Sequence, residues 1–152
     1  MPQTTIQQLA ALSDLLAARR EPILGAWRKM DRADPEQMSG RALTIGQFLD
    51  HIPPILDAYE LRLRSCPGGV DARAADIEKK QEGVKHGQHR WQQGYRLKEL
   101  ITECGHLHLC LFEELGSLGS ALPELEPATL MEAHLQLLHL IHDTISESAT
   151  QY

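Results

Sequence analysis

The stretch 86–103, HGQHRWQQGYRLKELITE, decides how this chain is interpreted. It is too polar to be plain core and too regularly patterned to be a loop. Apolar residues continue at helical spacing beyond it, so the periodicity predicts one long helix that carries the whole motif and ends around 116–120. Gly87 and Gly94 would lie inside that helix, each at a cost of about 1 kcal/mol against Ala. We therefore expect another backbone or a ligand to approach the helix there.

The composition favours an all-α fold. The chain has 152 residues, enough for one domain that spans 1–152. Aromatic residues make up only 5% of it, and we find no strand-like alternation. Leu and Ala are abundant, which is typical of a bundle packed by aliphatic side chains. The sequence therefore predicts a helical bundle of about four main helices.

Two further boundaries can be placed from local signals. A helix that begins near Thr44 should be kinked or divided at Pro53-Pro54, because proline removes a backbone donor and clashes with the preceding turn. The segment Cys66-Pro67-Gly68-Gly69 should end it. The last helix should begin near Ala128 and continue with apolar residues at heptad-like spacing.

Charge is distributed unevenly along the chain. The formal net charge is −6, which argues against nucleic-acid binding. All 15 Lys and Arg residues lie in 1–98, whereas 99–152 holds nine acidic residues and five histidines. A basic segment at 79–98 could therefore face the acidic part of a second protomer, or it could be a solvated helix face.

The cysteines and the absence of targeting signals predict a cytoplasmic protein. Cys66, Cys104 and Cys110 form no CxxC pair, which is typical of a reducing compartment. No apolar run is long enough to span a bilayer, and we find no signal peptide, so no membrane association is expected.

The central motif resembles the N-terminal domain of RsbRD-type RsbT co-antagonists, which also heads many bacterial sensor histidine kinases. The positions that carry the resemblance are His86, Gly87, Arg90, Gln93, Gly94, Tyr95, Leu97, Glu99, Leu100 and Glu103. Weaker similarity is found at 15–27 and at 50–56. The resemblance implies an all-helical, dimeric sensory domain of stress-response signalling that has no catalytic residues and feeds a partner or a fused output domain. We accordingly expect the chain to be an excised domain or a stand-alone relative.

The same motif offers a candidate ligand site. His86, Arg90 and Gln93 would share one helical face, and Trp91 and Tyr95 would form an aromatic wall at i,i+4 spacing. The planar guanidinium of Arg90 could bind a carboxylate or phosphate of a small molecule. The alternative is packing: Arg90 pairs with Asp50 or Glu99, the aromatic rings are core, and the glycines bring helices together.

The eight histidines raise the question of a metal or haem. Glu103 and His106 match half of a di-iron carboxylate pattern, but no second copy occurs. His139 and His142 are i,i+3 neighbours and would be the first to examine with that pair. Haem needs a single axial histidine, so that cofactor stays open. Most of these histidines are expected to be ordinary polar residues, and the sequence names no cofactor.

Catalysis is poorly supported, because the chain has no phosphate-binding loop, nucleophile elbow or kinase motif. His51 could accept a phosphoryl group, but it lies beside two prolines rather than in an uninterrupted helix. The sequence therefore predicts a non-enzymatic sensory or regulatory input domain, a homodimer, that passes a signal through its C-terminal helix. The alternatives are a purely structural dimerisation or protein-interaction module and a metal- or haem-binding bundle.

Overall fold

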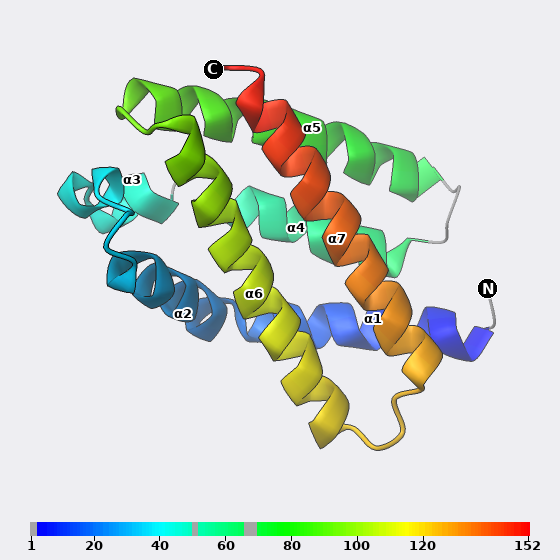
Figure 1. Cartoon of the computed structure of the whole chain (residues 1–152). Helices are drawn as coiled ribbons and strands as arrows, with labels where there is room; N and C mark the ends of the chain where they lie inside the picture. Colours follow the sequence, from blue (N-terminus) through cyan, green and yellow to red (C-terminus); the bar gives the residue numbers. More distant parts are fainter. Residues whose placement is uncertain (1–2, 50–51, 66–69) are drawn as a thin grey trace.

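The computed structural model describes residues 3–49, 52–65 and 70–152, and all the regular structure in these ranges is helical. The elements, shown in Figure 1, are α1 (Gln3–Ala18), α2 (Arg20–Ala33), the short 3-10 helix η1 (Ser39–Ala42), α3 (Ile45–Leu49), α4 (Ile52–Arg64), α5 (Val70–Gln92), α6 (Leu97–Ala121) and α7 (Pro127–Ala149). The predicted all-α bundle is confirmed. No described helix is both long enough and apolar enough to cross a membrane.

The helices pack in two layers. In Figure 1, α6 and α7 form an antiparallel pair that crosses over the others. Helix α7 packs on α5 as well as on α6, and α6 also packs on α2. Helix α4 lies against both α1 and α5. Helix α7 also contacts α1, so the C-terminal helix joins elements from both ends of the chain.

The core is mainly aliphatic, and its aromatic residues include Trp27, Phe48 and Tyr59. Trp27 and Phe48 are buried and stack with ring centroids 4.5 Å apart. The Trp27 indole donates to the backbone carbonyl of Glu103 over 3.0 Å, and the Tyr59 hydroxyl donates to that of Ala133 over 2.8 Å. Buried aromatic donors need such partners, and here they tie α2 to α6 and α4 to α7.

The prediction of one long helix through the central motif is wrong. Helix α5 ends at Gln92 and α6 begins at Leu97. Gly94 has a φ of 83°, the left-handed conformation that glycine adopts without strain. The amide of Tyr95 donates to the carbonyl of Arg90 over 2.9 Å, and that of Gly94 donates to Trp91 over 3.1 Å. This is the Schellman pattern that ends helices at a glycine, so Gly94 turns the chain rather than admitting a neighbour.

Of the two expectations at Pro53-Pro54, a kink or a division of the helix, the structure shows the division. Helix α3 ends at Leu49 and α4 begins at Ile52, so both prolines lie in the first turn of α4. A helix leaves its first amides unpaired, so proline costs nothing there. Asp50 and His51 lie outside the described residues, as does the expected stop at 66–69.

The boundaries near Thr44 and Ala128 agree with expectation. Thr44 precedes α3, where its hydroxyl accepts from the Gln47 amide over 3.2 Å, and its own amide donates to the Gln47 side chain over 2.9 Å. This reciprocal pair caps the helix. Helix α7 begins one residue earlier than expected, with Pro127 in its first turn.

Candidate functional site

A buried carboxylate marks the centre of the candidate site. Glu103, in the first half of α6, has no exposed side-chain surface. Its Oε1 is 2.8 Å from Nε2 of His86 and 2.9 Å from Nε of Arg90, and Oε2 is 3.1 Å from the same Arg90 nitrogen. His86 and Arg90 are also fully buried. The sequence motif thus folds onto itself across the turn at Gly94, and α5 and α6 share one charged cluster.

Arg90 also links this cluster to α3. Its Nη1 donates to the Gln93 side chain over 2.8 Å and to the backbone carbonyl of Gln47 over 3.1 Å. Its Nη2 donates to the carbonyl of Phe48. The guanidinium lies 5.4 Å from the ring centroid of Phe48 and 4.9 Å from that of Tyr95. These donor and cation–π contacts compensate the burial of the charge.

The cluster is electrostatically balanced. Burial by itself would raise the pKa of Glu103, but the hydrogen bond from His86 and the charge of Arg90 outweigh burial and hold that pKa below its usual range. The imidazole of His86 keeps one nitrogen, Nδ1, without a hydrogen-bond partner among the described residues. A buried polar atom in this state needs an explanation, because such atoms are nearly always paired.

A second polar cluster lies beside the first. Asp31, in α2, accepts from Gln37 over 3.1 Å and pairs with Nδ1 of His106 over 2.9 Å. The other ring nitrogen of His106 lies 3.4 Å from Asp34. The Gln37 amide also donates to the backbone carbonyl of Glu99 over 2.9 Å. Burial raises the pKa of Asp31, while the hydrogen bond from His106 opposes that shift. The sequence analysis did not identify Asp31 and Gln37, because neither residue belongs to a recognisable motif.

Helix α5 also makes a close backbone contact with α7. A Cβ added at Gly87 would lie 2.2 Å from the backbone oxygen of Ser148, and one at Gly83 would lie 3.4 Å from that of Thr144. The Ser148 hydroxyl donates to the carbonyl of Gly83 over 2.7 Å. The expectation that glycine in the motif admits another backbone is therefore confirmed at Gly87. The C-terminal end of α7 rests directly on the helix that carries His86 and Arg90.

The five predicted ligand residues lie in different surroundings. His86 and Arg90 are fully buried, Tyr95 is 4% exposed, Gln93 is half-buried and Trp91 is 58% exposed. The expected aromatic wall does not form, because the turn at Gly94 places one ring in solvent and the other in the core. A small molecule could reach the buried pair only if the helices moved apart.

Of the two alternative partners named for Arg90, Glu99 needs correction. Glu99 accepts instead from the amides of Met38 and Ser39, over 3.2 and 3.1 Å, and from the hydroxyl of Ser39 over 2.8 Å. Asp50 lies outside the described residues. Arg90 forms an ion pair with Glu103, one of the positions of the resemblance motif.

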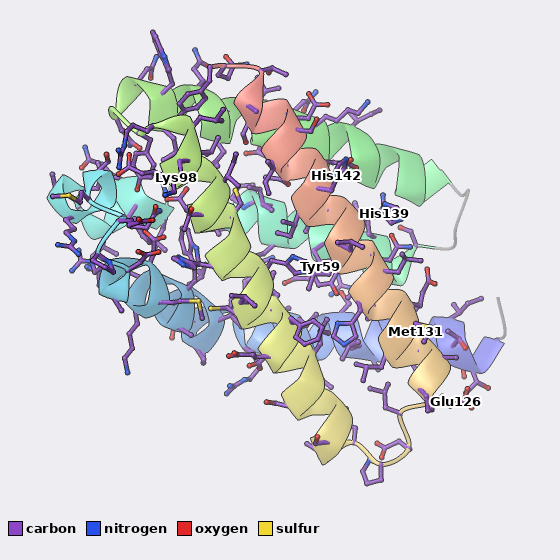
Figure 2. All side chains as sticks on the ribbon, viewed as in Figure 1. Tyr59, Lys98, Glu126, Met131, His139 and His142 are labelled. Carbon is purple, nitrogen blue, oxygen red and sulfur yellow. The ribbon has the colours of Figure 1, made fainter. Side chains whose placement is uncertain are left out.

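The four metal candidates do not converge. Glu103 is held by Arg90, and His106 pairs with Asp31. His139 and His142 lie exposed on α7, where Figure 2 labels them. Within 3–49, 52–65 and 70–152, no group of three His, Cys, Asp or Glu side chains could hold a metal ion.

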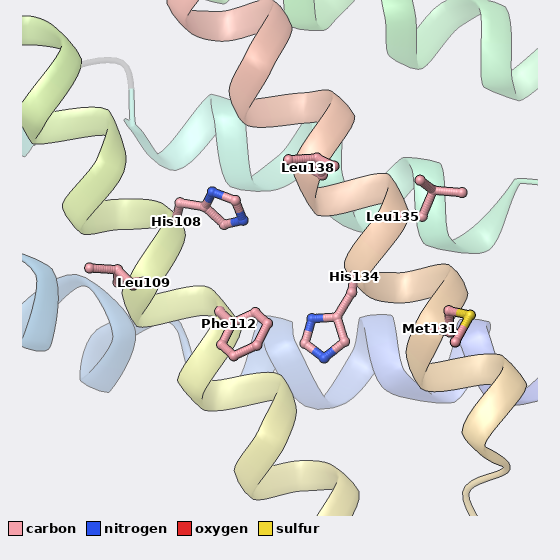
Figure 3. Close-up of a pocket in the computed structure, with 7 residues that line it drawn as sticks. All are labelled: His108, Leu109, Phe112, Met131, His134, Leu135 and Leu138. Carbon is pink, nitrogen blue, oxygen red and sulfur yellow. The ribbon is translucent and has the colours of Figure 1, made fainter.

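A surface groove that the sequence did not predict runs between α6 and α7 (Figure 3). It encloses about 510 Å³ and is lined by His108, Leu109, Phe112, Met131, His134, Leu135 and Leu138. The rings of Phe112 and His134 lie 4.6 Å apart across it. The available signal was that several apolar residues of both helices fall outside the stripe that packs inward.

Comparison with known proteins yields no relative: no family model, curated protein or solved structure matches this chain.

Proposed function

We propose that the protein is a non-catalytic sensory or regulatory input domain in which a change at the α5–α6 corner is passed to α7. This role is the one implied by the resemblance to RsbRD-type proteins and to histidine kinases. The protein would act in the cytoplasm as a homodimer and signal to a partner or an output domain.

The position of α5 carries this proposal. One helix holds His86 and Arg90 on Glu103 and, through Gly83 and Gly87, also supports the C-terminal end of α7. Such close backbone contact leaves no compliant side chain between the helices. A displacement of α5 would therefore be transmitted to α7 rather than absorbed.

The unpaired Nδ1 of His86 supplies a place where a signal could act. The cluster is one hydrogen bond short, so a proton or a ligand that satisfies Nδ1 would favour a different arrangement of the helices. A signal shifts such an equilibrium only through its different affinity for the two states. A catalytic role is less well supported, because the charge of Glu103 is neutralised by Arg90 and the group has no exposed surface.

The competing function is a purely structural interaction module, in which the charged cluster only fixes the fold. Both functions predict a stable helical domain, but they differ in how far a disturbance of the cluster spreads. Replacing His86 by Leu removes the hydrogen bond to Glu103 and leaves Arg90 in place. His139→Leu, on an exposed part of α7, is the matched control.

Hydrogen–deuterium exchange measured by mass spectrometry tests the relay. We expect His86→Leu to raise amide exchange at the α7 end that contacts α5, around Thr144 and Ser148, while α1 keeps its wild-type protection. The control should leave α7 protected. If exchange rises only in α5 and α6, or rises uniformly with the loss of global stability, the relay is refuted and the structural module is favoured.

A further inference from the structure

The outer face of α6 and α7 exposes more apolar surface than folding of one chain explains. Leu109, Phe112, Met131, Leu135 and Leu138 are 44% to 73% exposed. They line one continuous groove rather than lying scattered over the molecule. Contiguous apolar patches of this kind mark interaction sites.

Two glycines on the same face of α6 are also unexplained by the single chain. Gly105 and Gly116 fall on the stripe of Leu109 and Phe112 at helical spacing, and a Cβ added at either would have no atom within 4 Å. Gly87, by contrast, is needed for the packing of α7. Glycine inside a helix costs about 1 kcal/mol against Ala. Close approach of a helix from outside the chain would account for both positions.

The chemistry of the groove suits a second copy of the same chain. An interface with two-fold symmetry brings residues near the axis against their own counterparts, so a permanent charge there would meet its like. None of the seven lining residues is Lys, Arg, Asp or Glu. The two polar residues are histidines, and burial lowers the pKa of both His108 and His134, which favours the neutral imidazole.

The size of the face also fits. Helices α6 and α7 have 25 and 23 residues. At about 1.5 Å per residue and about 10 Å in width, the pair presents roughly 700 Å². A stable complex buries about 800 Å² on each partner.

We propose that a second copy of this chain docks on the outer face of α6 and α7, so that two antiparallel pairs form one four-helix contact. This inference rests on the homodimer of the proposed function and assigns its interface. It places the contact on apolar side chains and glycines, whereas the one contact between protomers that the sequence suggested joined a basic and an acidic segment.

Light scattering and native mass spectrometry of the full untagged chain test this interface. We expect a species of twice 17.0 kDa whose dissociation constant is insensitive to salt. Phe112→Asp should weaken the dimer about 100-fold or more, because a charge would be buried without a partner. Ile45→Asp is the control, since the two side chains are 52% and 54% exposed but Ile45 lies on α3.

Gly105→Leu is a second test of the interface, needed in case Phe112→Asp weakens the dimer only because that variant misfolds. A Cβ added at Gly105 meets no atom of its own chain within 4 Å, and Leu favours the helix over Gly. The melting temperature at concentrations where the chain is monomeric should therefore stay equal or rise. The dimer should weaken by about tenfold or more, because the second helix is held away.

Three results would overturn the interface. The first is a wild-type chain that is monomeric at about 100 μM, a concentration that would populate even a weak dimer. The second is a dimer that keeps its affinity in both variants or that dissociates steeply with salt. The third is a monomer carrying a small molecule that Phe112→Asp releases, which would make the groove a ligand site. The relay is judged separately, because α5–α7 coupling measured by exchange does not require a dimer.

Discussion

The Nε atom of Arg90 donates to both carboxylate oxygens of Glu103, over 2.9 and 3.1 Å, and neither side chain has exposed surface. The two residues lie on different helices, on either side of the turn at Gly94. The pair therefore exists only when that turn is closed, and it couples the end of α5 to the start of α6 and, through Phe48, to α3.

Replacing Arg90 alone should destabilise the fold more than replacing Arg90 and Glu103 together. We expect Arg90→Met to destabilise the fold by about 3–5 kcal/mol, since Glu103 would stay buried with only the hydrogen bond to His86. The double variant Arg90→Met, Glu103→Leu should recover part of that loss. Urea denaturation measures both, with Arg96→Met as control because its side chain is 70% exposed. A double variant less stable than the single one would contradict this account.

Gly87 and Gly116 should respond in opposite directions to the same substitution. Gly87→Ala places a Cβ 2.2 Å from the Ser148 oxygen, so α5 and α7 must separate. We expect a loss of about 1–3 kcal/mol, typical of overpacking. Gly116→Ala meets no atom within 4 Å and should gain up to about 1 kcal/mol in the monomer from helix propensity. Thermal unfolding distinguishes the two, and equal effects would refute the assigned contact.

The turn between α5 and α6 should require the left-handed backbone conformation of Gly94. It should not require the absence of a side chain, because there is room for one. Its φ is 83°, and an added Cβ would meet nothing within 4 Å. Gly94→Ala should therefore cost about 1–2 kcal/mol through strain in the left-handed region. Gly94→Asn should cost less, because Asn tolerates that conformation better. Chemical denaturation of both variants provides the check, and an Ala variant as stable as wild type would argue against the turn.

His134, one of the two histidines that line the groove, should make the stability of the fold depend on pH. Burial, followed by the neighbouring His108, lowers the pKa of His134 in the folded chain. The native state therefore keeps its full stability above the unfolded pKa of about 6.5 and loses part of it as the pH falls through that value towards the folded pKa. Melting temperatures at about pH 7.5 and 5.5 should differ less in His134→Gln. An unchanged pH dependence would show that His134 does not contribute.

Local sequence determined the helical class and several boundaries, because periodicity and end signals depend on neighbours along the chain. The aliphatic stripe of α7, Pro127 at its start and the close approach at Gly87 could all be recognised in this way. Gly94 could not, since a glycine within apolar periodicity looks the same whether the helix continues or turns. The helix turns at Gly94 because Tyr95 can then be buried. The residues that bury it belong to η1, α3 and α6.

The candidate site depended still more on tertiary structure. The sequence identified His86 and Arg90, but their partner Glu103 could be chosen over Glu99 only once the turn set the two helices side by side. The groove between α6 and α7 was not predicted either, because exposed and buried apolar residues look alike until the helices are packed. Sequence thus determined which elements form, and tertiary structure decided which charges meet and which apolar face stays uncovered, since both depend on contacts between distant residues.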